Sequence, residues 1–138
     1  MRIANLTETV QEFVRQLPEG VIHIKDRGHY NSWIEKHIMP DDNTYVIVRV
    51  SYFENGGVYK YPADAITIGE RNGSVYVEAD PDTATVLVDP ENYLVTMDDG
   101  SRGIPLRNCK AYYDAIDATG YVSEDDWHTI DNFYHIAW

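Results

Sequence analysis

The sequence predicts an α+β domain: a mainly antiparallel sheet of about five to seven strands, with one helix before it and two after it. Three observations predict this class. Short runs of alternating apolar residues, separated by turn residues, fill the chain between residues 44 and 97. Apolar residues recur at helical spacing in residues 6–17, and they do so again after residue 106. No linker or repeat divides the 138 residues, so we expect a single domain over 1–138.

The first helix is expected over residues 6–17, where apolar side chains form one stripe. Asn5 is the expected N-cap, and Glu8 follows it at the spacing of a capping box. Pro18 and Gly20 end the helical pattern. Residues 21–25 then alternate as a short strand does.

Residues 29–39 are expected to form a short helix or turn that Pro40 stops. Residues 44–53 carry the strongest strand pattern in the chain, with apolar side chains on both faces and Arg49 as the only charge. A strand that is apolar on both faces is typical of a central strand covered on both sides.

Further strands are expected up to residue 106, and turn residues separate them. Asn72-Gly73 is the clearest hairpin turn, because Asn-Gly supplies the positive φ angles of a type I′ turn. Asp98-Asp99-Gly100 is a second turn. The segment that follows this turn contains Pro105, which confines it to a sheet edge. The expected strands are 57–62, 65–69, 74–79, 83–89, 92–97 and the short segment 101–106.

Two helices are expected to close the chain. The first spans residues 107–119, and Gly120 follows it at the C′ position. Ser123 caps the last helix, 124–136, whose three opening acids complement the positive end of the helix dipole.

Charge is the strongest departure from an average composition, with a net value of −12. Residues 1–71 hold 10 acids and 8 Lys or Arg, a net charge of −2, whereas residues 72–138 hold 13 acids and 3 bases, a net charge of −10. Such a loading disfavours non-specific binding to nucleic acid or anionic lipid and favours basic partners. We therefore expect no direct nucleic-acid binding.

The expected partner-binding residues are the acids of the second half and two aromatic side chains between them. Glu78, Asp80 and Asp82 alternate, so an extended chain would place their carboxylates on one side at intervals of ~6.7 Å, the scale of phosphate spacing. Aromatic residues supply the large contact area that interfaces use. The full set is Glu78, Asp80, Asp82, Asp98, Asp99, Asp114, Asp117, Glu124, Asp125, Asp126, Trp127, Asp131 and Tyr134.

Catalytic chemistry has no specific motif here, so we name no catalytic residue and no cofactor. His128, Asp131 and His135 share one helical face at spacings of three and four, which is compatible with zinc or iron ligation, although a solvated face is the simpler interpretation. His29, Glu35 and His37 form a second cluster of ligand types without a standard spacing. His23 and Cys109 are better explained by ordinary packing or exposure than by catalysis.

The acidity, small size and eleven tyrosines resemble the small inhibitors carried by phages and mobile elements, the anti-CRISPR and antirestriction proteins, some of which imitate the charge of DNA. The features that carry this resemblance are the Glu78/Asp80/Asp82 alternation, Asp98-Asp99 and the run from Asp114 to Asp131. The resemblance implies a non-enzymatic protein that occupies the basic nucleic-acid channel of a nuclease complex.

We therefore expect an acidic interaction protein that binds and blocks a basic, nucleic-acid-binding protein or ribonucleoprotein. The alternatives are a metal-dependent enzyme using His128, Asp131 and His135, and a structural or assembly subunit. Cys109 is the only cysteine and no apolar run approaches ~20 residues. The N-terminus also lacks a signal-peptide pattern, so we expect a cytoplasmic protein, in the host cytosol if a phage encodes it.

Overall fold

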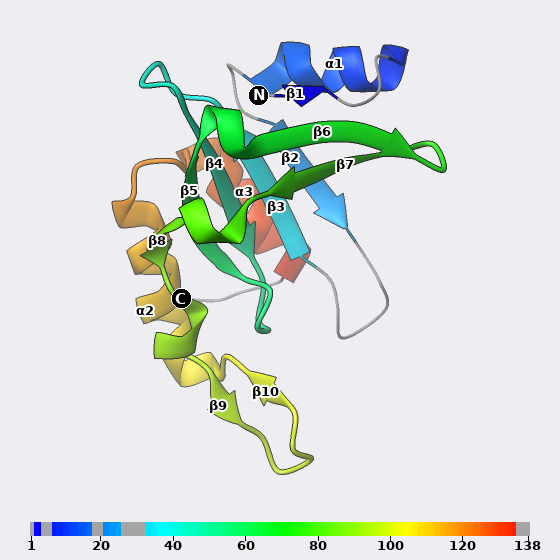
Figure 1. Cartoon of the computed structure of the whole chain (residues 1–138). Coiled ribbons are helices and arrows are strands. Elements are labelled where there is room, and N and C mark those ends of the chain that lie inside the picture. The colour runs from blue at the N-terminus through cyan, green and yellow to red at the C-terminus, as the bar shows by residue number, and fades with distance from the viewer. Residues whose placement is uncertain (1, 4–6, 18–20, 26–32, 135–138) are drawn as a thin grey trace.

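The computed structural model describes residues 2–3, 7–17, 21–25 and 33–134 (Figure 1). Its centre is a five-stranded antiparallel sheet with the strand order β2-β3-β4-β5-β8. These strands are β2 (Val21–Lys25), β3 (Trp33–Ile38), β4 (Thr44–Val50), β5 (Gly57–Pro62) and β8 (Thr85–Val88). The expected α+β class is confirmed, including the leading helix and the two trailing helices.

The central strand β4 is buried on both faces, as its sequence predicts. Val46 and Val48 belong to the apolar core on one face of the sheet, while Tyr45 and Ile47 belong to the core on the other. All four side chains are 2% exposed or less. The sheet therefore separates two cores, each closed by different elements.

One core is covered by α1 (Glu8–Gln16) and by the hairpin of β6 (Ile66–Arg71) and β7 (Ser74–Ala79) (Figure 1). The short β1 (Arg2–Ile3) adds to β6 in parallel, and η2 (Ala63–Ala65) connects β5 to β6. The hairpin turn is the expected one, because Asn72 and Gly73 have φ angles of 54° and 79°. Thr7, and not the expected Asn5, caps α1 by accepting a hydrogen bond from the Val10 amide. Asn5 itself lies outside the described residues.

The other core is covered by α2 (Leu106–Ala118) and α3 (Glu124–Tyr134). α2 buries Cys109, Tyr112, Tyr113 and Ile116 on one stripe, and Gly120 follows with the positive φ of 79° expected at C′. In α3, Ile130 is 2% exposed and packs in the same core. Both helices thus present their opposite, polar sides to solvent.

Residues 33–38 form a strand, so the expected helix or turn over residues 29–39 is wrong there. β3 pairs with β2 on one side and with β4 on the other. Its alternation was hidden by polar residues, since Glu35 and His37 are buried on the face opposite to Ile34 and Ile38. Buried polar side chains on one face made the segment look half-exposed.

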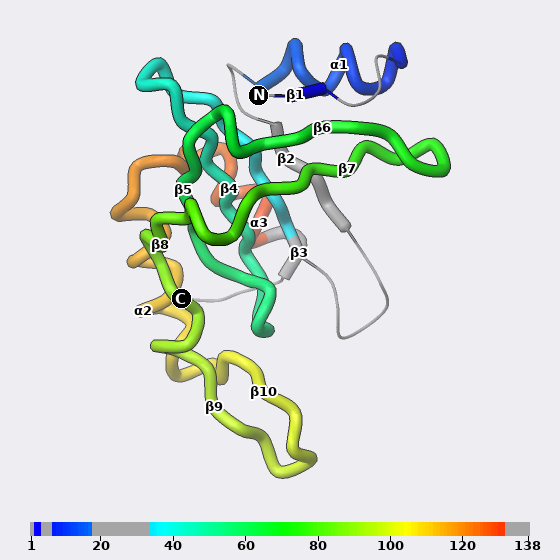
Figure 2. Tube along the Cα trace, in the orientation of Figure 1, coloured from blue at the N-terminus to red at the C-terminus, as the bar shows by residue number. Residues whose placement is uncertain are grey.

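The segment between β7 and α2 holds less strand than expected. Prolines start two turns of 3₁₀ helix, η3 (Pro81–Thr83) and η4 (Pro90–Asn92), on either side of β8. The strands β9 (Val95–Thr96) and β10 (Arg102–Gly103) form a separate two-stranded hairpin. This hairpin extends away from the central sheet beyond the start of α2 (Figure 2).

Candidate interaction face on helices α2 and α3

The two C-terminal helices carry four exposed acids of the expected partner-binding set. The buried stripe of α2 turns Asp114 and Asp117 toward solvent, and both are exposed. Glu124 and Asp125 in the first turn of α3 are exposed as well. We call Asp114, Asp117, Glu124, Asp125 and the side chain of Trp127 the α2–α3 face.

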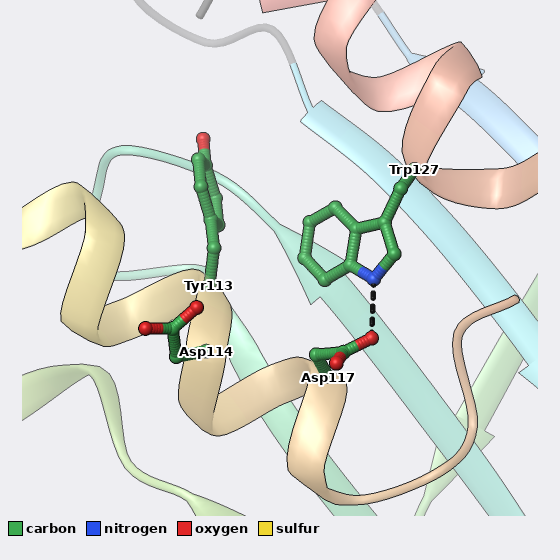
Figure 3. A pocket seen from close by; sticks show the side chains of 4 residues that line it. All are labelled: Tyr113, Asp114, Asp117 and Trp127. Carbon is green, nitrogen blue, oxygen red and sulfur yellow. Dashed lines mark hydrogen bonds between the residues drawn. The ribbon is translucent and has the colours of Figure 1, made fainter. Parts of the chain in front are cut away.

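A hollow of about 200 Å³ lies between the two helices on this face (Figure 3). It is lined by Tyr113, Asp114, Asp117 and Trp127. The indole Nε1 of Trp127 donates a 2.7 Å hydrogen bond to Oδ1 of Asp117. The Tyr113 and Trp127 rings pack edge-on, with their centroids 5.5 Å apart. The hollow therefore combines two carboxylates with two fixed aromatic rings.

The basic side chain nearest in sequence to this hollow is Lys110, whose Nζ donates a 2.8 Å bond to Oδ2 of Asp114. Both partners of that pair are well exposed, so the attraction between them is weak in water. A competing cation can displace Lys110 at small cost. The hollow has the chemistry to hold a guanidinium or ammonium group, because the carboxylates pair with the charge and the partly exposed Trp127 ring attracts it. Tyr113 is 1% exposed and supports the Trp127 ring from the core side.

Asp126 does not belong to the interaction face, contrary to expectation. It is 8% exposed, and its Oδ2 accepts bonds of 2.7 Å from Lys36 Nζ on β3 and 2.8 Å from the Ser123 amide. The Ser123 hydroxyl accepts the Asp126 amide in return, so the two residues form the capping box of α3. Burial opposes the charged form, yet the bonds from Lys36 and Ser123 hold the pKa of Asp126 below its usual value. Asp126 fixes α3 to the sheet.

The last two expected residues of α3 differ in what the structure describes. Asp131 is half-buried, and its Oδ1 has no hydrogen-bond partner among the residues described. The Tyr134 side chain lies outside the described part of the chain. Trp127 is half-buried against the core, so it offers part of its ring to the hollow.

The acids Glu78, Asp80 and Asp82 do not continue along one extended strand, so the expected regular spacing is wrong. Glu78 lies in β7, whereas Asp80 caps η3 by accepting a 3.1 Å hydrogen bond from the Asp82 amide. Pro81 starts this 3₁₀ turn because its fixed φ suits the first helical position. All three acids are exposed, but the chain changes direction in the 3₁₀ turn that contains Asp82.

Asp98 and Asp99 lie in the turn between β9 and β10. Asp99 Oδ1 accepts from both the amide and the hydroxyl of Ser101, and these bonds lower the pKa of its carboxyl. The open hollow beside this turn, about 540 Å³ in volume, also contains Arg107, which offsets part of its negative charge. The exposed acids of the expected set therefore occupy three places: the α2–α3 face, the end of β7 with η3, and the β9–β10 turn.

Sequence reasoning missed a buried polar network on the opposite face of the sheet. Glu35 accepts bonds from Arg49 Nε at 2.6 Å and from His37 Nε2 at 3.0 Å, and His37 Nδ1 lies 3.0 Å from the Tyr45 hydroxyl. Burial opposes ionisation of Glu35, but the His37 and Arg49 bonds hold its pKa far below its usual range. The alternating positions of Glu35 and His37 were the only signal in the sequence.

Most of this network is buried among the described residues, although the Arg49 side chain is 32% exposed. Glu35 and His37 are 3% exposed, and Tyr45 is fully buried. The Phe13 ring of α1 packs edge-on against the His37 ring at 5.5 Å. Burial and the negative charge of Glu35 raise the pKa of Tyr45 far above its usual value, so the hydroxyl stays protonated. The network links β3 to β4, because Glu35 binds Arg49 and His37 lies against the Tyr45 hydroxyl.

The structure describes only part of the two histidine clusters that were considered as metal sites. His135 and His29 lie outside the described residues, so each cluster lacks one of its members there. The side chain of His23, which belongs to neither cluster, also lies outside them. Among the residues that the structure describes, no three His, Cys, Asp or Glu side chains form a possible metal site.

Cys109 is buried, its thiol lies 3.4 Å from the Pro105 carbonyl oxygen, and burial raises the pKa of the thiol. In the described part of the chain no helix is long and apolar enough to cross a membrane.

Comparison with known proteins adds no relative. Neither the family models, nor the curated proteins, nor the solved structures with which the chain was compared give a match.

Proposed function

We propose that this protein is a non-enzymatic, acidic interaction protein whose α2–α3 face binds a basic, nucleic-acid-binding partner and blocks it. The observation that carries the proposal is the hollow between α2 and α3, where Asp114 and Asp117 stand beside the rings of Tyr113 and Trp127. An Arg or Lys side chain of the partner would enter this hollow. Glu124 and Asp125 would contact further basic residues around it.

The preformed geometry of the hollow supports this assignment. Asp117 is held by the Trp127 indole, and Trp127 packs against Tyr113, so the walls lose little conformational entropy on binding. Aromatic anchors beside charges are typical of the residues that carry most of the energy in protein interfaces. The exposed acids around the hollow would speed association with a positively charged surface.

A nucleic-acid channel is the partner surface that best suits this chemistry. Such channels present rows of Lys and Arg that hold phosphates, and carboxylates can take the place of those phosphates. The net charge of −10 over residues 72–138 disfavours contact with DNA or RNA itself. CRISPR effector complexes and restriction nucleases are the partners that we propose to test.

DNA cleavage by a panel of purified CRISPR effector and restriction nuclease complexes tests this function. We expect the protein to slow cleavage by at least one complex, and excess DNA substrate to relieve the inhibition because both compete for one channel. If no complex is inhibited, or if inhibition persists at any DNA concentration, binding in the nucleic-acid channel is wrong.

A further inference from the structure

The strand β8 forms the edge of the central sheet in the described residues, and its outer side is apolar and exposed. Within the part of the chain that the structure describes, the strand order ends at β8, which pairs with β5. Val86 is 49% exposed and Leu87 is 41% exposed. In the described part of the chain, the backbone hydrogen bonds outside helices and strands include none from residues 85–88. This edge can accept another strand.

β8 carries none of the charged side chains that often protect an edge, although a bulge interrupts its pairing with β5 between Val58 and Tyr59 and leaves Leu87 without a paired residue. Natural proteins discourage strand addition with charged residues, especially lysine, on the edge strand itself. β8 reads Thr-Val-Leu-Val and carries no charge. Pro81 and Pro90 lie in the 3₁₀ turns on either side and limit the edge to a short length, but neither lies within it.

Charge around the β8 edge decides which strand would fit. Residues 72–101 contain no Lys or Arg, and acids stand at both ends of β8: Asp80 and Asp82 before it, Asp89 and Glu91 after it. Asp89 is exposed and accepts the Glu91 amide at 3.0 Å, whereas Glu91 is bound to Arg102. Three of the four carboxylates near this edge therefore lack a basic partner within the described residues.

A second copy of this chain fits the edge poorly. Antiparallel pairing of β8 with β8 would bring Asp80 and Asp82 of one copy toward Asp89 of the other, and like charges opposite each other destabilise strand pairs. A strand with basic residues at both ends would meet carboxylates at both ends. Apolar or β-branched residues in the middle of such a strand would cover Val86 and Leu87.

We infer that the β8 edge binds an extended segment of a basic partner by strand addition, with apolar or β-branched residues beside Val86 and Leu87 and Lys or Arg at either end. Backbone hydrogen bonds supply the attachment in this mode, and alternate side chains supply its specificity. The inference shares with the proposed function only the charge of the partner. Its surface, β8, differs from the α2–α3 face, so the two can fail separately.

A peptide probe tests the inference on the intact, isotope-labelled protein. The probe is a capped nonapeptide, Lys-Lys-Thr-Val-Thr-Val-Thr-Lys-Lys, and amide NMR shifts are followed as it is added. We expect saturable shifts at residues 85–88 and slower amide hydrogen exchange there. A peptide with proline in place of both valines should bind at least tenfold more weakly, because proline disfavours a paired strand and removes donors.

Val86→Lys is the matching change in the protein, with Val86→Thr as its control. Val86 is half-exposed, so both variants should fold, which their spectra would show. We expect Val86→Lys to weaken the probe at least tenfold and Val86→Thr to keep binding within about threefold, since threonine favours strands as valine does. Equal binding of the proline peptide, or of Val86→Lys, would overturn strand addition.

The Trp127 indole resonance separates this inference from the proposed function. Shifts of Trp127 without shifts at residues 85–88 overturn the β8 inference and leave the α2–α3 face standing as a binder of basic groups. Shifts at residues 85–88 that the proline peptide does not cause support the β8 inference, whatever Trp127 does. An absence of shifts at residues 85–88 up to millimolar probe also overturns it.

Discussion

At the scale of single residues, the contacts of Lys36 and Asp126 decide how α3 is held. Lys36 Nζ donates to Asp126 at 2.7 Å and to the Tyr121 carbonyl oxygen at 3.0 Å, and the side chains in the ion pair are only 15% and 12% exposed. The pair links β3 to the first turn of α3. An ion pair so enclosed costs desolvation to form, but breaking it leaves one charge without a partner.

We therefore predict that Asp126→Ala lowers the free energy of unfolding by about 3 kcal/mol, because Lys36 loses its partner and α3 loses its capping box. Asp125→Ala is the matched control, since Asp125 is exposed in the same helical turn. It should change stability by less than about 0.5 kcal/mol. Urea unfolding measures both, and equal stability of the two variants would contradict the role given to Asp126.

Glu35 gives a prediction about pH. Its pKa in the folded protein lies far below its ordinary value of 4.5, so the folded state binds fewer protons than the unfolded state below about that pH. Its contribution to stability is complete above pH 4.5 and is lost as the pH falls toward the folded pKa. Glu35→Gln should therefore flatten the dependence of unfolding free energy on pH between 5 and 2.

Urea unfolding across that pH range checks this, with Glu12→Gln as the control. Glu12 is exposed on α1, and its partners among the described residues are exposed groups of the same helix, so its removal should leave the slope nearly unchanged. A Glu35→Gln protein whose stability falls with pH as steeply as that of the parent would count against the ionised buried network.

At the scale of elements, strands and turns with local signals were predictable and those fixed by distant contacts were not. The pattern of β4 and the Asn72-Gly73 turn depend on residues adjacent in sequence, and both are confirmed. β3 was missed because its buried Glu35 is satisfied by Arg49, fourteen positions away. Pairing across the sheet made this polar residue a core residue, which a single strand's pattern does not reveal.

The β6–β7 turn gives a stability prediction. Gly73 has a φ of 79°, and a Cβ built there would meet no atom within 4 Å. Gly73→Ala therefore brings only the conformational cost of a positive φ, about 1 kcal/mol. Thermal unfolding should show the loss, and the matched change Ser74→Ala, in the adjacent exposed position, should have a smaller effect. An unchanged melting temperature for Gly73→Ala would contradict the positive-φ turn.

At the scale of the whole molecule, the second half of the chain carries the negative charge, but the fold distributes it over several surfaces. The sequence identified Asp114, Asp117, Glu124 and Asp125 as partner-binding acids, and the structure shows that all four are exposed on α2 and α3. It could not identify Asp126 as the partner of Lys36, ninety positions away, nor the hollow between two helices. Both depend on packing between elements that lie far apart in the chain.

The central claim is that charge on the α2–α3 face holds the partner. It predicts that Asp114→Asn/Asp117→Asn weakens binding at least tenfold, because the hollow loses both carboxylates while an amide oxygen at position 117 can still accept the Trp127 indole. Asp41→Asn/Asp64→Asn removes the same charge from two exposed positions outside this face, and should weaken binding less than threefold.

The decisive measurement is the dissociation constant of the inhibited nuclease complex for the parent and both double variants, at low and moderate salt. We expect a large loss of affinity for Asp114→Asn/Asp117→Asn, a small one for the control pair, and a parent affinity that falls as salt rises. Equal losses for the two pairs would mean that only total charge matters. Unchanged affinity for both would contradict the acidic face altogether.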